Sequence, residues 1–187
     1  MLLENGDRIV FAGDSVTDMG SANPVGEGLF ESLGNGYVRE IENLLTAWYP
    51  ELNIRVTNSG ISGNTSRDLA ARFDRDVVDL KPDWVSICIG INDVWRQFDV
   101  PAISEAAVMP QEYESNMEEM ILKIKDNVKG IFIISPYYIE ANKRIICVSE
   151  WTNMWKYAKN LQRGIHYILW IFKKHLKISV KSNILPN

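Results

Sequence analysis

Residues 8–18 read RIVFAGDSVTD, in which a short apolar run leads directly into a glycine, an aspartate and a serine. An apolar run of this length that ends at a glycine is typical of a buried strand. Similar runs follow at residues 53–57 (NIRVT), 83–89 (DWVSICI) and 130–135 (GIFIIS). Helical patterns lie between them, at residues 36–48, 66–80 and 111–127. Strands that alternate with helices predict an α/β fold of three layers, α/β/α, with a central parallel sheet.

Two of the predicted helices carry more specific signals. In residues 36–48, one side of the helix collects Tyr37, Ile41, Leu44, Leu45 and Trp48. The second helix is expected to have Ser66 as its N-cap and to run to Leu80, because Pro82 would then stop it.

Composition restricts the class of protein. The chain has 187 residues, of which 46% are hydrophobic and 24% charged, as expected for one globular domain. Disorder, collagen and coiled coil are excluded by composition, and the longest apolar run, residues 165–172, is too short for a membrane helix. The N-terminus lacks the pattern of a secretory signal, and Cys88 and Cys147 make no disulfide framework. We therefore expect a cytoplasmic protein.

Charge divides the chain into two parts. Residues 1–141 hold 11 Lys and Arg against 23 Asp and Glu, a net charge of −12. Residues 142–187 hold 9 Lys and Arg and one acid, Glu150, a net charge of +8. We interpret residues 1–141 as the folded core and residues 142–187 as a basic tail that is no separate domain. A basic tail usually suggests binding to nucleic acid or an anionic membrane, but another cause is argued below.

Polar residues follow three of the predicted strands, in the loops at residues 13–18, 58–65 and 90–96. Ligands of parallel sheets bind beyond the carboxyl ends of the strands, so these loops are the candidate site. Ser15 is placed to present its hydroxyl at the sheet rim, although a turn or helix cap would explain the same residues. The chain has no G-x-S-x-G elbow, so the usual α/β-hydrolase signature is absent.

The other two loops offer hydrogen-bond donors. In the second loop, glycines such as Gly63 expose backbone N–H groups, the donors that acyl transfer aims at a developing oxyanion. The alternative is a loop that needs positive φ. In the third loop, the amide of Asn92 is a further candidate donor, with a turn or Asx motif as the alternative, and Asp93 is expected to cap or brace the loop.

Taken together, the three loops resemble the SGNH/GDSL hydrolase family. The G-D-S serine, the glycine and the G-x-N-D asparagine of that family match Ser15, Gly63 and Asn92. Longer stretches are similar to its acetylxylan esterase branch: GDSVTD, GNGYV, YPELNIRV, NSGISGNTSRDL, KPDWVSICIGINDVWRQFD and SPYYIE. The resemblance covers roughly residues 8–140. It implies a flavodoxin-like sheet and a serine ester hydrolase that removes acetyl groups from xylan or xylo-oligosaccharides.

The resemblance also implies roles for individual residues. Ser15 would be the nucleophile, and the backbone N–H groups of Ser15 and Gly63 and the side chain of Asn92 would form the oxyanion hole. Trp95 would wall off a small acyl pocket, unless it belongs to the core. Arg96 would touch the sugar, although a solvated or ion-paired arginine is the favoured alternative.

Other expectations concern bracing residues and ligands. Asp18 and Asn64 are expected to brace the site without a catalytic role. No metal cluster, phosphate loop or dinucleotide fingerprint is visible, so no cofactor and no metal are expected. The implied partner is an acetylated xylo-oligosaccharide or another small acetyl ester, with no nucleic acid and no membrane. A homo-oligomer is left open.

The general base of the family is missing from the sequence. A serine is a weak nucleophile until a neighbouring base takes its proton, and the family uses the histidine of an Asp-x-x-His block. The only histidines are His166 and His175, and the residues three positions before them are Arg163 and Phe172. Neither histidine is a convincing base, so the base is unknown.

A shifted reading frame accounts for both the basic tail and the missing block. Read one base out of phase from Lys143 onward, allowed codons give an acidic helix, an FVD strand and a further helix, like the family's own continuation. Some residues are forced: the pairs Trp151–Thr152 and Trp170–Ile171 each give aspartate. The hypothesis is a frameshift near Lys143, which would leave one edge of the sheet unpaired. The alternative is a genuine basic tail.

Two classes of function follow. The first is an ester hydrolase of the acetylxylan esterase type, impaired because its Asp-x-x-His is absent. The second is a non-catalytic protein that keeps the esterase scaffold and binds acetylated glycan or, through its tail, an anionic surface.

Overall fold

The chain folds around one seven-stranded sheet. The computed structural model describes residues 2–30, 32–99, 104–134, 168–171 and 179–180. The strands are β1 (Arg8–Gly13), β2 (Gly26–Glu27), β3 (Arg55–Gly60), β4 (Trp84–Cys88), β5 (Gly130–Ile134), β6 (Ile168–Ile171) and β7 (Ser179–Val180). The helices are α1 (Ser15–Asp18), α2 (Tyr37–Trp48), α3 (Ser66–Asp76), α4 (Ile91–Trp95) and α5 (Pro110–Ile124).

The sheet has the order β2-β3-β1-β4-β5-β6-β7. The five central strands, from β3 to β6, are parallel, as the sequence predicts. The short strands β2 and β7 at the two edges are antiparallel to their neighbours, so the sheet is mixed. These two-residue strands are too short to give a sequence pattern.

The apolar run of the tail also forms part of the sheet. We expected an unpaired edge beside β5, but β6 lies parallel to β5 there, with Ile131 opposite Ile168. The physical reason is that an unpaired strand edge offers backbone hydrogen-bonding groups, and any apolar segment of suitable length can pair with them.

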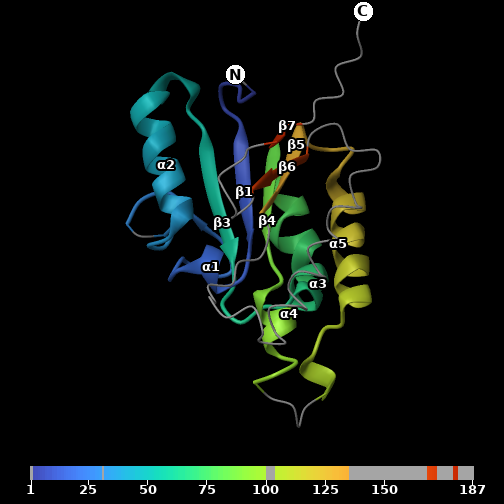
Figure 1. Ribbon diagram of the computed structural model, residues 1–187. Coiled ribbons are helices and arrows are strands. Elements are labelled where there is room, and N and C mark those ends of the chain that lie inside the picture. Colours follow the sequence, from blue (N-terminus) through green and yellow to red (C-terminus); the bar gives the residue numbers. More distant parts are fainter. Residues whose placement is uncertain (1, 31, 100–103, 135–167, 172–178, 181–187) are drawn as a thin grey trace, which may run out of the picture.

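Helices cover both faces of the sheet (Figure 1), which confirms the three-layer architecture. On one face, α2 packs over Ile9 and Phe11 of β1. On the other face, α3 and α5 pack over Val10 and Ala12 of the same strand. This alternation is what a strand with both faces buried requires. No helix in the described part of the chain is long and apolar enough to cross a membrane.

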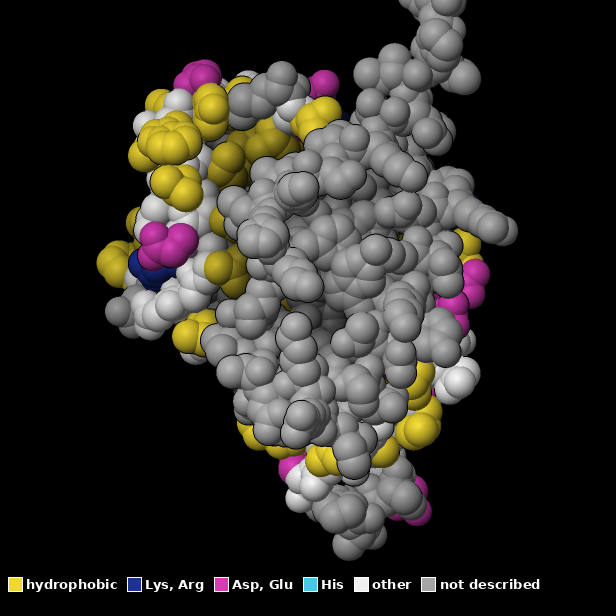
Figure 2. Space-filling model, in the orientation of Figure 1, with side chains coloured by type: hydrophobic (Ala, Val, Ile, Leu, Met, Phe, Trp, Pro, Cys, Tyr) yellow, Lys and Arg dark blue, Asp and Glu magenta, His cyan; other side chains and the backbone are white. Residues whose placement is uncertain are grey.

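The apolar side of α2 is only partly buried. Ile41 and Leu45 pack against the sheet, but Leu44 is 49% exposed and Trp48 is 70% exposed, so the apolar side seen in the sequence is not buried along its whole length. The buried stripe is centred nearer to Val38, which leaves Leu44 and Trp48 at its border. Figure 2 shows the resulting hydrophobic surface over α2, at the upper left.

The helix expected at residues 66–80 begins and ends differently. Its N-cap is Thr65, not Ser66: the Thr65 hydroxyl and the Asp68 carboxylate form a capping box with each other's backbone N–H. The α-helix ends at Asp76, and a separate turn of 3-10 helix (η2) covers Val78–Leu80.

The strand order reverses direction at β1. From β1 the chain crosses to β3 on one side through α2, and from β3 it returns past β1 to β4 through α3 on the opposite face. Parallel sheets bind ligands at such a reversal, beyond the carboxyl ends of the strands. Figure 1 shows α1 and α4 together at this end, which is the lower end in that view.

Candidate active site

Three strands end side by side at the candidate site. Gly13, the last residue of β1, lies opposite Gly60 of β3 and Cys88 of β4. The segments that follow these strands therefore leave the sheet at the same level, which brings the loops of Ser15, Gly63 and Asn92 to one rim.

Ser15 is the first residue of the short helix α1. The carboxylate of Asp14 caps this helix by accepting a hydrogen bond from the Val16 backbone N–H at 3.0 Å. A side chain at Gly13 would place its Cβ 2.4 Å from the backbone oxygen of Cys88, so the turn needs a glycine. Because the first N–H groups of a helix have no partner within it, the Ser15 N–H is available to a ligand.

The loop that carries Gly63 is tied to the ends of β1 and α1. The Ile61 N–H donates to the Gly13 oxygen at 3.1 Å, and the Ser62 N–H donates to the Asp18 carboxylate at 3.0 Å. Gly63 has a φ of +86°, and a Cβ there would meet nothing within 4 Å. Glycine is therefore needed for its backbone conformation, which is the alternative that the sequence left open, and this does not conflict with a donor role.

Asn92 lies in the first turn of α4, with its side chain buried. Its Nδ2 donates to the backbone oxygen of Asn64 at 2.8 Å. A carbonyl oxygen can accept only from the nitrogen end of the amide, so this bond fixes which way the amide points. The second N–H of the Asn92 amide remains to serve as a donor. Asp18 and Asn64 thus make the bracing contacts that we expected.

Two buried carboxyl groups lie beneath the rim. Burial raises the pKa of Asp14 to about 6, against the lowering effect of the Val16 N–H, and the charge of Asp93 raises it further. Burial likewise raises the pKa of Asp93 to about 6, while the hydroxyl and N–H of Ser66 act in the opposite direction. The contact from the Ser66 N–H is 2.9 Å long and fastens α4 to the first turn of α3, which is the bracing role expected for Asp93.

The carboxyl group of Asp14 should make stability depend on pH. Its pKa rises from 3.8 to about 6, so between these values the folded chain binds more protons than the unfolded chain and stability falls as pH rises. Asp14→Asn keeps a capping oxygen but removes the buried charge. The free energy of unfolding can be measured with urea at pH 4 and at pH 8. Between these two pH values, the free energy of unfolding of the variant should rise by on the order of 2 kcal/mol relative to that of the unsubstituted chain.

The matched control is Asp126→Asn, which changes an exposed aspartate just after α5. It should leave the pH dependence unchanged. An Asp14→Asn chain with the same pH dependence as the parent would contradict the assignment.

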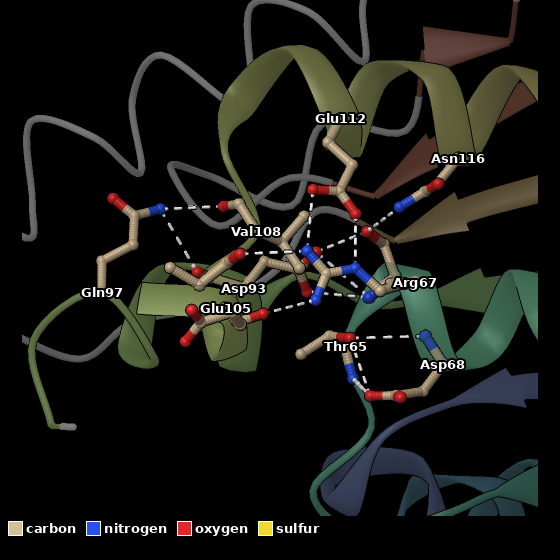
Figure 3. Close-up of polar contacts among 11 residues, drawn as sticks. Thr65, Arg67, Asp68, Asp93, Gln97, Glu105, Val108, Glu112 and Asn116 are labelled. Carbon is tan, nitrogen blue, oxygen red and sulfur yellow. Dashed lines mark hydrogen bonds and ion pairs between the residues drawn. The ribbon is translucent and has the colours of Figure 1, made fainter. Parts of the chain in front are cut away.

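Arg67 holds the segment after α4 in place, and the sequence did not single it out. Its Nε and Nη2 donate to the Glu112 carboxylate at 2.5 and 2.8 Å, and its Nη1 donates to the Glu105 backbone oxygen at 2.8 Å. Figure 3 shows Arg67 between Glu112 of α5 and this segment, with the Gln97 amide bonded to the Val108 oxygen nearby. Glu112 lies 45 residues away in the chain, so no local pattern could have shown the pair.

The expected substrate residues lie on α4 and just after it. Trp95 is 54% exposed, so it does not belong to the core. Arg96 forms an ion pair with Asp99, the alternative that was favoured for it. His166 and His175 lie outside the described residues. Among the described residues, no three His, Cys, Asp or Glu side chains gather in a way that could hold a metal ion.

Comparison with known proteins identifies the family. A sequence model of the GDSL-like lipase/acylhydrolase family matches residues 11–165. The chain belongs to this family. The match includes all three segments at the rim of the sheet.

Several known proteins are similar to this GDSL-like chain in sequence and in structure. An acetylxylan esterase from Geobacillus stearothermophilus is 54% identical over 144 residues, which are 77% of this chain and 66% of the relative. The crystal structure of the acetylxylan esterase Axe2 from the same organism superposes with a TM-score of 0.83 at 45% identity, covering 92% of this chain and 78% of Axe2. LAE5, an alpha/beta hydrolase from the metagenome of Lake Arreo, gives a TM-score of 0.85 at 39% identity, covering 92% of this chain and 79% of LAE5.

Solved structures of Axe2 include catalytic mutants. These mutants replace a serine, an aspartate and the histidine three residues after that aspartate. The 187 residues of this chain contain no Asp-x-x-His.

Proposed function

We propose that this GDSL-like protein is a serine ester hydrolase that removes acetyl groups from xylo-oligosaccharides. The observation that carries the proposal is the rim itself: Ser15, Gly63 and Asn92 follow three adjacent parallel strands that end in register. The acetylxylan esterase that matches 77% of the chain supports the substrate class.

The proposed chemistry is acyl transfer through Ser15. The Ser15 oxygen attacks the acetyl carbonyl, and the carbonyl oxygen becomes an oxyanion. The N–H groups of Ser15 and Gly63 and the free N–H of the Asn92 amide stabilise that charge, and each such donor typically contributes about 10²–10³ in rate. The sugar leaves with a proton, and water then releases acetate from the acylated serine.

The mechanism also needs a base that accepts the proton of Ser15. The proton has to pass to this base before or during the attack, and the family places that base in Asp-x-x-His. Without this block we propose that the chain keeps its oxyanion hole but hydrolyses esters slowly. Trp95 and Arg96 are proposed to contact the acetyl group and the sugar at the edge of the site.

The test is acetate release from acetylated xylo-oligosaccharides and hydrolysis of an aryl acetate, with Ser15→Ala beside the unsubstituted chain. We expect a slow rate that Ser15→Ala removes and that the matched control Ser115→Ala, an exposed serine of α5, leaves intact. Equal rates in the parent and Ser15→Ala would overturn the proposal. Binding of the oligosaccharide without turnover would point to a non-catalytic scaffold.

A further inference from the structure

Arg72 of α3 is a buried arginine directly behind the candidate site. Its side chain is 9% exposed. One nitrogen, Nη2, donates to the backbone oxygens of Gly13 at 3.1 Å and Ser59 at 3.0 Å. Nη1 donates to the Ser59 hydroxyl at 3.1 Å, and Nε donates to Oδ1 of Asn64 at 2.7 Å. One guanidinium thus joins the end of β1, the end of β3 and the loop that follows β3.

Each of these partners lies close to a donor of the proposed oxyanion hole. Gly13 comes two residues before Ser15, and Asn64 directly follows Gly63. The backbone oxygen of Asn64 also holds the Asn92 amide at 2.8 Å. Arg72 therefore contacts, or reaches through one residue, the segments that carry all three donors.

We infer that Arg72 is a positioning residue that fixes the relative placement of the three oxyanion donors. The inference rests on the proposed function and deepens it. Oxyanion stabilisation needs donors that already point to where charge develops, and a shift of about 1 Å can lower a rate about 10²-fold.

The chemistry of the side chain fits this role. The planar guanidinium offers five donors in a fixed fork, so one side chain can bind several carbonyl oxygens at set angles, which a lysine ammonium cannot reproduce. Asp76 balances the buried charge, with its carboxylate 3.1 Å from Nη1. Packing of α3 on the sheet already rests on the buried side chains of Leu69 and Phe73, so the helix does not need Arg72 for its attachment.

Arg75 gives a matched control, because it lies on the same helix and also pairs with Asp76 but is exposed and contacts none of the strand ends. Arg72→Lys keeps the positive charge beside Asp76 and removes the fork. Arg75→Lys makes the same chemical change away from the site. Asn64→Ala serves as a second variant, since it removes one Arg72 contact without touching the buried ion pair.

The first measurement is steady-state hydrolysis of an aryl acetate. We expect Arg72→Lys to lower the Ser15-dependent kcat about 10–100-fold, less than the loss of a whole donor, with KM changed less than about threefold. Asn64→Ala should show a smaller loss of kcat, and Arg75→Lys none. Unchanged kcat in Arg72→Lys, or an equal loss in Arg75→Lys, would overturn the inference.

The second measurement does not depend on turnover. Amide hydrogen exchange by NMR should be about tenfold faster or more in Arg72→Lys at Ile61 and Asn64, whose N–H groups donate to the oxygens of Gly13 and Ile61, and unchanged at Met120 in α5. Unchanged exchange at both Ile61 and Asn64 would overturn the positioning role even if activity fell. Absence of any Ser15-dependent rate would instead count against the proposed function, and the exchange result would still decide whether Arg72 holds the loop.

Discussion

A chain whose reading frame is restored at Lys143 and continues through the family's Asp-x-x-His block is expected to hydrolyse aryl acetates about 10⁴–10⁶ times faster than the 187-residue chain. The shifted reading resembles the family's continuation up to that block. The block itself, which would supply the base for Ser15, follows later in the restored frame. In another serine hydrolase, loss of one triad member lowers kcat by about this factor. The measurement is kcat for the two chains, expressed and assayed in parallel.

The control for this gain is Ser15→Ala in the restored chain, which should lower the rate to that of Ser15→Ala in the 187-residue chain. Equal rates in the two chains would contradict the hypothesis. So would DNA sequencing across codons 138–150 of an independent isolate that showed an undisturbed frame. The pair Trp170–Ile171, which gives an aspartate in the shifted reading, lies in β6, so both readings place a strand at this position.

Replacing Asn92 by alanine is expected to lower the Ser15-dependent kcat about 10²–10³-fold, with little change in KM. The amide of Asn92 would act on the oxyanion, which exists only after attack, so its removal weakens the transition state more than the bound substrate. Steady-state kinetics on an aryl acetate separate the two effects.

Asn92→Asp sharpens this experiment. A carboxylate has nearly the same shape as the amide, but it would place an acceptor opposite the Asn64 oxygen and would repel the oxyanion. The loss of kcat in Asn92→Asp should therefore be larger than in Asn92→Ala. The matched control is Asn127→Ala, an exposed asparagine after α5, which should have no effect. A kcat for Asn92→Ala within threefold of the parent would remove Asn92 from the proposed site.

Much of the fold could be predicted from local patterns. The strand of residues 8–12, the strand of residues 83–89 and the strand of residues 130–135 were each visible as short apolar runs, because a strand buried on both faces needs apolar side chains in succession. The three loops could also be predicted, because parallel strands separated by helices must all end at one edge. This rule predicts that Ser15, Gly63 and Asn92 lie at one edge of the sheet.

The boundaries of the helices could not be predicted as well. Thr65 and Ser66 are both residue types that favour the N-cap. In the structure, the N–H and the hydroxyl of Ser66 donate to the carboxylate of Asp93 on α4, a contact that the local sequence does not show. The short helices α1 and α4 were expected as loops, since four or five residues carry no helical period. Leu44 and Trp48 lie on the apolar side of α2 but are exposed, because a sequence shows the apolar stripe but not where the sheet lies beneath it.

By itself the sequence determined the alternation of strands and helices, the polar residues at the strand ends and the absence of Asp-x-x-His. The tertiary structure alone decided which distant groups pair: Arg67 with Glu112, 45 residues away, and Arg72 with the backbone oxygen of Gly13, 59 residues away. The physical reason is the distance along the sequence between the interacting residues. Strand and helix patterns arise between residues a few positions apart, whereas a buried arginine finds its acceptors only after the helices have crossed the sheet.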